Sequence, residues 1–138
     1  MELLSMDLSS VDVSRPVAIA GPTVFVLREA TIEPVKDDPN TQQLVCQFDN
    51  KFALKDSKDP GVSHEPGKIK VTTRLILGEK GKWTVDSTKQ ELKKMLISCK
   101  SPDVSFGDPS KYIGRDFDVR LGIELDDTGK YDPKNSIR

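Results

Sequence analysis

The sequence has few of the residues that build covalent frameworks or catalytic centres. Its 138 residues include two cysteines, Cys46 and Cys99, and one histidine, His64. Two cysteines outside any C-x-x-C pair are too few for a disulfide framework, and we expect both to be reduced core residues. His64 and its acidic neighbours match neither a catalytic arrangement nor the ligand spacing of a zinc or calcium site. We therefore expect neither an enzyme nor a bound metal or cofactor.

Long apolar runs are also missing. No stretch approaches the ~20 apolar residues that span a bilayer. Residues 1–7 lack the basic start and the apolar core of a secretory signal. With 31% charged and 36% hydrophobic residues, the chain has the composition of one soluble domain that can bury a core without disulfides. We expect it in the cytoplasm, without membrane contact.

The basic residues that are present are unevenly distributed. Residues 1–50 hold 3 basic and 8 acidic side chains, residues 51–100 hold 12 and 6, and residues 101–138 hold 6 and 8. The middle third is therefore basic, although the chain as a whole has a formal net charge of −1. Such asymmetry is a sign of a nucleic-acid surface.

The segment from Lys68 to Leu77 is the strongest predicted strand. In an extended strand successive side chains point to opposite faces. The apolar positions are Ile69, Val71, Leu75 and Leu77, and the polar positions are Lys68, Lys70, Thr72 and Arg74. One face therefore needs a core, and the other offers cations. These cations form either the solvated side of a half-buried sheet or a binding surface.

Four further strands are predicted from alternation and turn signals. They cover residues 23–33, 44–52, 117–125 and 130–138. The apolar set of the first strand changes face near Arg28, which predicts a bulge there. The first two strands should form a hairpin, and residues 126–129 should form the turn between the last two. Residues 55–67 are predicted as a polar loop.

One helix is predicted over residues 87–99. Leu92, Met95, Leu96 and Cys99 follow a helical spacing. A capping box is available from Ser87 with Gln90 or from Thr88 with Glu91.

Three strands, a helix and two strands follow one another in this order. An OB-fold is a five-stranded Greek-key barrel whose second and third strands bind oligonucleotides. We therefore predict a mainly β domain over residues 23–138, a five-stranded OB-like Greek-key barrel with one α-helix between strands three and four. Residues 1–22 are predicted as an N-terminal arm or lead-in.

A single nucleic-acid strand requires a positive groove and aromatic faces on which bases stack. The candidate cations are Lys51, Lys68, Lys70, Arg74, Lys80 and Lys82, with Lys55 and Lys58 nearby. The first aromatic candidate is Trp83, and the others are Tyr112, Tyr131, Phe52 and Phe106. Each aromatic residue is either a stacking platform or part of the core, and the sequence leaves both open.

Three segments together resemble a family of bacteriophage OB-fold proteins found among phage replication and recombination functions. They are residues 12–34, from Asp12-Val13-Ser14-Arg15-Pro16 through Gly21 to Pro34; the helix residues 92–98; and residues 112–121 with Gly129 and Asn135. The similarity covers most of residues 10–138 and lies in the order of the segments. It implies an OB-fold and binding of single-stranded DNA, in the host cytoplasm if the protein is viral.

The sequence thus predicts a non-sequence-specific single-stranded DNA-binding protein of phage replication or recombination, with replication or recombination proteins or further copies of itself as other partners. The alternative is an OB-like protein-interaction or assembly module without nucleic-acid binding, in which a strand edge or the 55–67 loop docks a partner. Salt dependence separates the two, because counterion release makes nucleic-acid binding steeply salt-sensitive.

Overall fold

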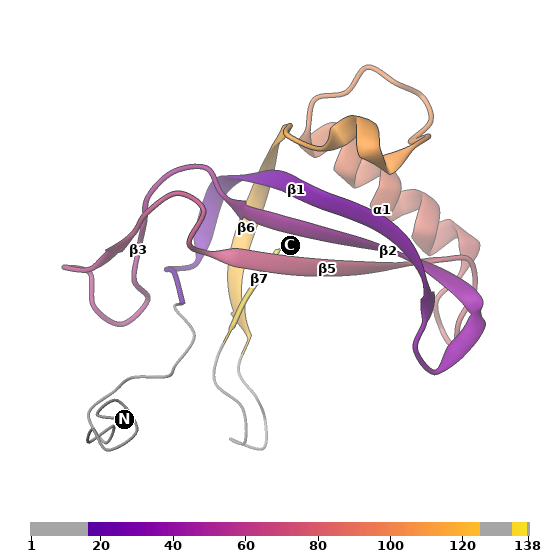
Figure 1. Ribbon diagram of the computed structural model, residues 1–138, viewed down its shortest axis with the longest axis horizontal. Helices are drawn as coiled ribbons and strands as arrows, with labels where there is room; N and C mark the ends of the chain where they lie inside the picture. The colour runs from indigo at the N-terminus through magenta and orange to yellow at the C-terminus, as the bar shows by residue number, and fades with distance from the viewer. Residues whose placement is uncertain (1–16, 125–133, 138) are drawn as a thin grey trace, which may run out of the picture.

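A computed structural model describes residues 17–124 and 134–137 and shows a mainly β protein with one α-helix (Figure 1). The long strands are β1 (Gly21–Val35), β2 (Asp38–Asn50), β5 (Lys70–Leu77), β6 (Asp116–Glu124) and β7 (Lys134–Ile137). Two short strands, β3 (Leu54–Lys55) and β4 (Ser63–His64), form a separate pair, and α1 spans Val85–Ser98. The predicted arm before residue 17, the turn at 126–129 and the first part of the last predicted strand lie outside the described residues.

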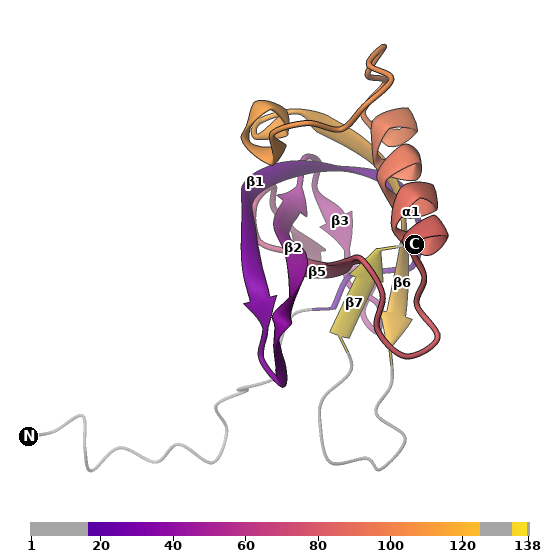
Figure 2. The same ribbon diagram turned by 90° about the vertical axis from the view of Figure 1, so that its right-hand side faces the viewer.

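The five long strands form one antiparallel sheet in the order β5-β2-β1-β6-β7. The predicted hairpins between the first two strands and between the last two are both present, and the helix lies between the third and fourth long strands. The sheet curls strongly, so that its edge strands β5 and β7 come close together (Figure 2). They do not pair within the described residues, and the sheet there is open.

The predicted bulge in the first strand is confirmed. The register of β1 against β2 shifts between Leu27 and Glu29, which leaves Arg28 as the extra residue. The strand runs further than predicted, through Pro34 to Val35. Because β6 pairs only with the first part of β1, Pro34 lies where β1 has a single neighbouring strand, and such an edge position tolerates a missing N–H.

The core lies on one face of the sheet. Its buried side chains include Phe25, Leu27, Leu44, Cys46, Phe48, Val71, Leu75, Phe117 and Leu121. Rings from β2 and β6 meet edge to face across it, with the centroids of Phe48 and Phe117 5.3 Å apart. In β5, Val71 and Leu75 are buried whereas Lys70, Thr72 and Arg74 are exposed, so the alternation predicted for this strand is confirmed.

The connection predicted as a loop at 55–67 is instead largely a small hairpin formed by β3 and β4. Buried Asn50 holds it to the main sheet: its Nδ2 donates to the carbonyl oxygens of Phe52 (2.8 Å) and Glu65 (3.1 Å), and its Oδ1 accepts from the amide of Ile69 (2.9 Å). Two-residue strands have no measurable apolar period, which is why the sequence pattern did not reveal them.

The helix starts two residues before its predicted position. Thr84 is the N-cap: its Oγ1 accepts from the amide of Ser87, and the Ser87 hydroxyl accepts from the amide of Thr84. This reciprocal arrangement is a capping box in which Ser87 replaces the usual Glu or Gln. Thr88, one of the predicted caps, does not cap the helix and is buried against β5, where its hydroxyl donates to the carbonyl of Ile76. No helix of the described residues is both long enough and apolar enough to cross a membrane.

Candidate nucleic-acid interface

The outer face of β5 carries the candidate cations. Lys70 and Arg74 project from the strand into solvent, Lys68 is exposed just before it, and Lys82 is exposed in the turn after it. None of these four side chains forms an ion pair with a carboxylate of the described residues. The sequence therefore placed these four cations on the surface correctly, and the fold leaves their charge available to an anion.

Arg28 is a further cation near this face. In the sequence it marked the bulge of the first strand and was not among the candidate binding residues. Its Nε donates to Oδ1 of Asp49 at 2.9 Å, and the Asp49 side chain is 9% exposed against 56% for Arg28. The other guanidinium nitrogens have no acceptor in residues 17–124 or 134–137. Asp49 lies directly opposite Lys70 in the β2–β5 register, so the residue that holds Arg28 neighbours a cation of β5.

Two of the predicted cations are engaged in ion pairs. Lys51 pairs with Asp116 of β6, and the Lys80 Nζ lies 2.6 Å from Oδ1 of Asp37. The hydrogen bond from Lys80 lowers the pKa of the Asp37 carboxyl below its ordinary value, and the lysine charge acts in the same direction. Exposed pairs of this kind contribute little to stability, because solvent screens their charges. An incoming phosphate can therefore displace either carboxylate at small cost.

Tyr112 does not lie on the surface. It ends a short 3₁₀ helix (Pro109–Tyr112), its side chain is fully buried, its hydroxyl donates to the Phe106 carbonyl at 2.7 Å, and the two ring centroids are 4.5 Å apart. We correct its predicted stacking role, because no face of the ring is open to a base.

Phe52 is the only aromatic side chain of the described residues that is largely exposed, at 55%, with the Lys51 Nζ 5.7 Å from its ring centroid. Tyr131 lies outside them.

Trp83 combines a structural role with a partly open ring. Its Nε1 donates to the carbonyl of Ile76 (3.1 Å) and to Oγ1 of Thr88 (2.9 Å), and Thr88 itself donates to the Ile76 carbonyl at 2.6 Å. These contacts fix the end of β5 to the start of α1. The side chain is half-buried, so it is no free platform on the outer face, although its ring borders an apolar groove.

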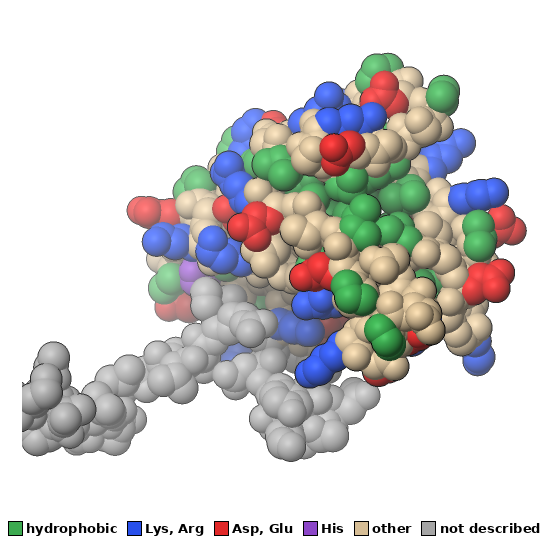
Figure 3. Space-filling model, turned by 45° about the vertical axis from the view of Figure 1, so that its right-hand side comes forward, with side chains coloured by type: hydrophobic (Ala, Val, Ile, Leu, Met, Phe, Trp, Pro, Cys, Tyr) green, Lys and Arg blue, Asp and Glu red, His purple; other side chains and the backbone are tan. Residues whose placement is uncertain are grey.

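The apolar groove lies between α1, β5 and β6 and has a volume of about 720 Å³. Phe48, Leu75 and Phe117 lie at its base, with Trp83, Met95 and Val119 around them. Hydrophobic side chains gather in a hollow on this side of the molecule (Figure 3). Arg74, exposed on β5, also lines the groove and joins it to the cationic outer face.

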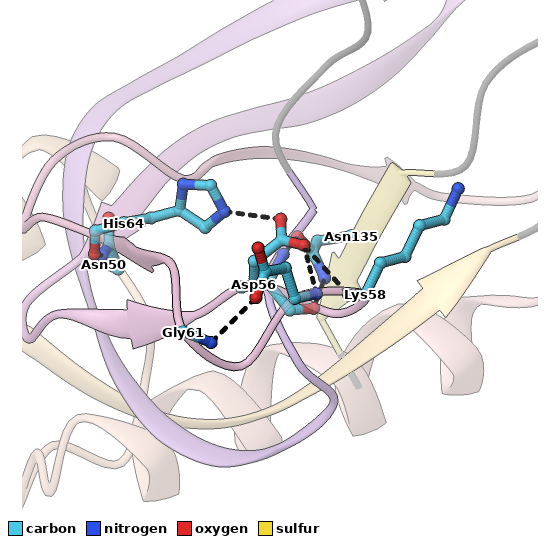
Figure 4. A network of polar contacts seen from close by, with 8 residues as sticks. Asn50, Asp56, Lys58, Gly61, His64 and Asn135 are labelled. Carbon is cyan, nitrogen blue, oxygen red and sulfur yellow. Dashed lines mark hydrogen bonds and ion pairs between the residues drawn. The ribbon is translucent and has the colours of Figure 1, made fainter.

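His64 belongs to a hydrogen-bond network within the β3–β4 hairpin. Its Nε2 lies 2.9 Å from Oδ1 of Asp56, whose Oδ2 accepts from the amides of Lys58 and Asp59 at 3.0 Å each (Figure 4). These contacts, led by the His64 hydrogen bond, lower the pKa of Asp56 below its ordinary value. The network closes the β3–β4 hairpin. No cluster of three or more potential metal-ligating His, Cys, Asp or Glu side chains occurs in the part of the chain that the structure describes.

Comparison with models of known protein families finds no match to this sequence, and comparison with curated proteins finds none either. The similarity to phage OB-fold proteins therefore remains a prediction that depends on the residues quoted for it. The functional argument depends on the cations of β5 and their surroundings.

Proposed function

We propose that this protein binds single-stranded DNA without sequence preference, through the outer face of β5. The contact set is Lys68, Lys70 and Arg74 on and before β5, Lys82 in the turn after it, Arg28 from the bulge of β1, and Lys51 with Phe52 after β2. Lys80 contributes by exchanging Asp37 for a phosphate. In phage replication or recombination, the activity that the family resemblance implies, such a protein would coat exposed single strands.

The observation that carries this proposal is the row of cations on β5 without carboxylate partners among the described residues. Lys70 and Arg74 project from the same face and are separated by four residues, roughly 13 Å along a strand. Such spacing lets a single extended backbone meet both charges. Among the described residues, Arg28 is held by Asp49 through Nε alone, which leaves its terminal nitrogens for a phosphate oxygen.

The strand order supports the finer fold on which this proposal draws. The sheet order β5-β2-β1-β6-β7 is what an OB-like Greek-key barrel gives when it is opened between its third and fifth long strands. Those two strands, β5 and β7, lie close together. In a barrel closed at this seam, the outer faces of the second and third long strands would be the oligonucleotide-binding surface, and β5 is the third.

The test is fluorescence anisotropy of a labelled oligo-dT, titrated with the protein at two or more salt concentrations. Phosphate contacts release counterions, with a slope of roughly −0.7 in log affinity against log salt per contact. Lys70→Glu with Arg74→Glu should weaken binding strongly and make the salt dependence shallower by roughly 1.4. The matched control is Lys89→Glu with Lys93→Glu, two exposed cations of α1 without an ion pair in the described residues.

Three outcomes would count against the proposal. Equal losses in the two double variants would show that only net charge matters and that the β5 face is not the site. Unchanged affinity in the β5 variant would exclude that face even if DNA binding is real. Absence of binding to oligo-dT at low salt by the folded protein would exclude the function.

The second candidate function is a protein-interaction or assembly module, and one observation favours it. The carbonyl of Ile69 accepts from the backbone amide of Asn50 in β2. The carbonyl of Ile76 instead accepts from the side chains of Trp83 and Thr88, on the opposite side of β5. Backbone groups alternate in direction along a strand. The backbone groups of Lys70, Thr72 and Arg74 therefore face away from β2. They have no strand partner among the described residues, and such an edge can pair with a strand of another chain. Binding of that kind would not follow the salt slope of DNA.

A further inference from the structure

The apolar groove beside α1 exposes hydrophobic surface that the described residues leave uncovered. Its base reaches core residues Phe48 and Phe117, and Ile97 at its border is 67% exposed. The groove opens next to Arg74, at the edge of β5 that has no strand partner within residues 17–124 and 134–137. A ligand lying along the outer face of β5 therefore passes this opening.

The charges around the groove indicate an anionic ligand. Two carboxylates line it, but each has a lysine partner: Glu91 pairs with Lys94 at 3.0 Å, and Asp118 pairs with Lys100 at 3.9 Å. Arg74 is the lining charge that has no such partner in the described residues. A suitable ligand thus combines an apolar group with an anion, and a nucleotide has this composition.

In the part of the chain that the structure describes, no largely exposed aromatic ring lies near Arg74. A single strand is held by base stacking in addition to phosphate contacts. The one largely exposed aromatic ring of the described residues, Phe52, follows the end of β2 that bonds to Ile69, near the start of β5. At the Arg74 end, the apolar surface available to a base is the groove, with the ring of Trp83 in its wall.

We propose that the groove binds a nucleobase of single-stranded DNA, while the adjoining phosphate contacts Arg74. This inference rests on the proposed function and adds to it a base subsite between α1 and β5. The base leaves the outer face, enters the groove and packs against Trp83 and Met95. The subsite contributes affinity without requiring base identity, because an apolar wall accepts the face of any base.

Trp83 makes the proposal directly measurable, since it is the only tryptophan in the chain. The full chain is titrated with unlabelled oligo-dT while Trp83 emission is followed, and anisotropy of labelled oligo-dT is measured in parallel. We expect saturable quenching with the same midpoint as the anisotropy. Ile97→Asp should weaken binding about tenfold, as expected for loss of one stacked base. The control Val104→Asp makes the same kind of change at a fully exposed position that does not line the groove, and should bind within about twofold of the original protein.

Each contrary result has a distinct meaning. Saturable anisotropy without any change in Trp83 emission, together with equal affinities for the two variants, would show that no base enters the groove while leaving the proposed function intact. No anisotropy change at low salt would refute the proposed function and this subsite together. If ultracentrifugation shows an oligomer that Ile97→Asp converts to monomer, a second copy covers the groove and the base subsite is refuted.

Discussion

Replacing Asn50 tests a concentrated set of hydrogen bonds of one buried side chain. The side chain is 1% exposed and links the end of β2 to both ends of the connection that leads to β5. Asn50→Ala removes three short hydrogen bonds and leaves the Ile69 amide and two carbonyl groups without their side-chain partner. Each such bond contributes about 1 kcal/mol net, and more where the abandoned group stays buried. We expect a loss of about 3 kcal/mol in the free energy of unfolding.

The assay is urea unfolding followed by circular dichroism. With an m-value of about 2 kcal/mol/M, a loss of about 3 kcal/mol lowers the midpoint by about 1.5 M. Asn40→Ala is the matched control, because Asn40 is exposed near the β1–β2 turn, and a surface change of this type is worth at most about 0.5 kcal/mol. A second readout is hydrogen exchange at the Ile69 amide, which should become faster in the Asn50 variant by local opening.

The reasoning would be refuted by equal midpoints for the two alanine variants. It would also be refuted if Asn50→Asp were as stable as the original protein at neutral pH. The carboxylate would keep the acceptor for the Ile69 amide but would face the carbonyl oxygens of Phe52 and Glu65, so it should destabilise at least as much as alanine.

Two further predictions concern titrating groups. Burial raises the pKa of the Cys46 thiol to about 11, whereas Cys99 is partly accessible. A thiol reagent at pH 8 should therefore modify one cysteine per folded chain and two after denaturation. Rapid modification of both cysteines in the folded protein would contradict the packing. The pKa of Asp56 is lower in the folded state than its unfolded-state value near 4. The ionised carboxylate therefore stabilises the fold fully above the unfolded-state pKa. This contribution is lost as the pH falls through the lower folded-state pKa. Urea midpoints measured between pH 5 and about 3 should fall more steeply for the original protein than for Asp56→Asn, and parallel curves would show that Asp56 does not stabilise the fold.

The parts of the fold that were predictable from sequence are those with a local period. β5 and β6 alternate with few exceptions, the face change at Arg28 marks a bulge, and the stripe around Leu96 marks a helix. In each case the physical cause, one buried side of a strand or helix, acts on residues close in sequence. Local patterns were therefore sufficient for the order of the five long strands and the helix, but not for the short β3–β4 pair.

The features that were missed depend on contacts between distant residues. The role of Arg28 requires the β1–β2 register, which brings it to Asp49 twenty-one positions later. Tyr112 resembles a surface aromatic in sequence because it lies among polar residues, and only the packing against Phe106 shows it as core. The β3–β4 hairpin depends on hydrogen bonds between side chains and the backbone: Asn50 donates to a carbonyl, and Asp56 accepts from an amide. Such bonds leave no apolar period in the sequence.

The cations on β5 admit a second physical explanation that the charge-reversal experiment can separate from DNA binding. β5 is an edge strand, and lysine or arginine on an exposed edge prevents strands of other molecules from pairing with it. That protective role requires charge of either sign, so Lys70→Glu with Arg74→Glu should keep the protein free of aggregation. Binding of single-stranded DNA requires positive charge, so the same variant should lose affinity. Lys70→Thr with Arg74→Thr removes both properties, and comparing the two variants assigns these side chains to one role or to both.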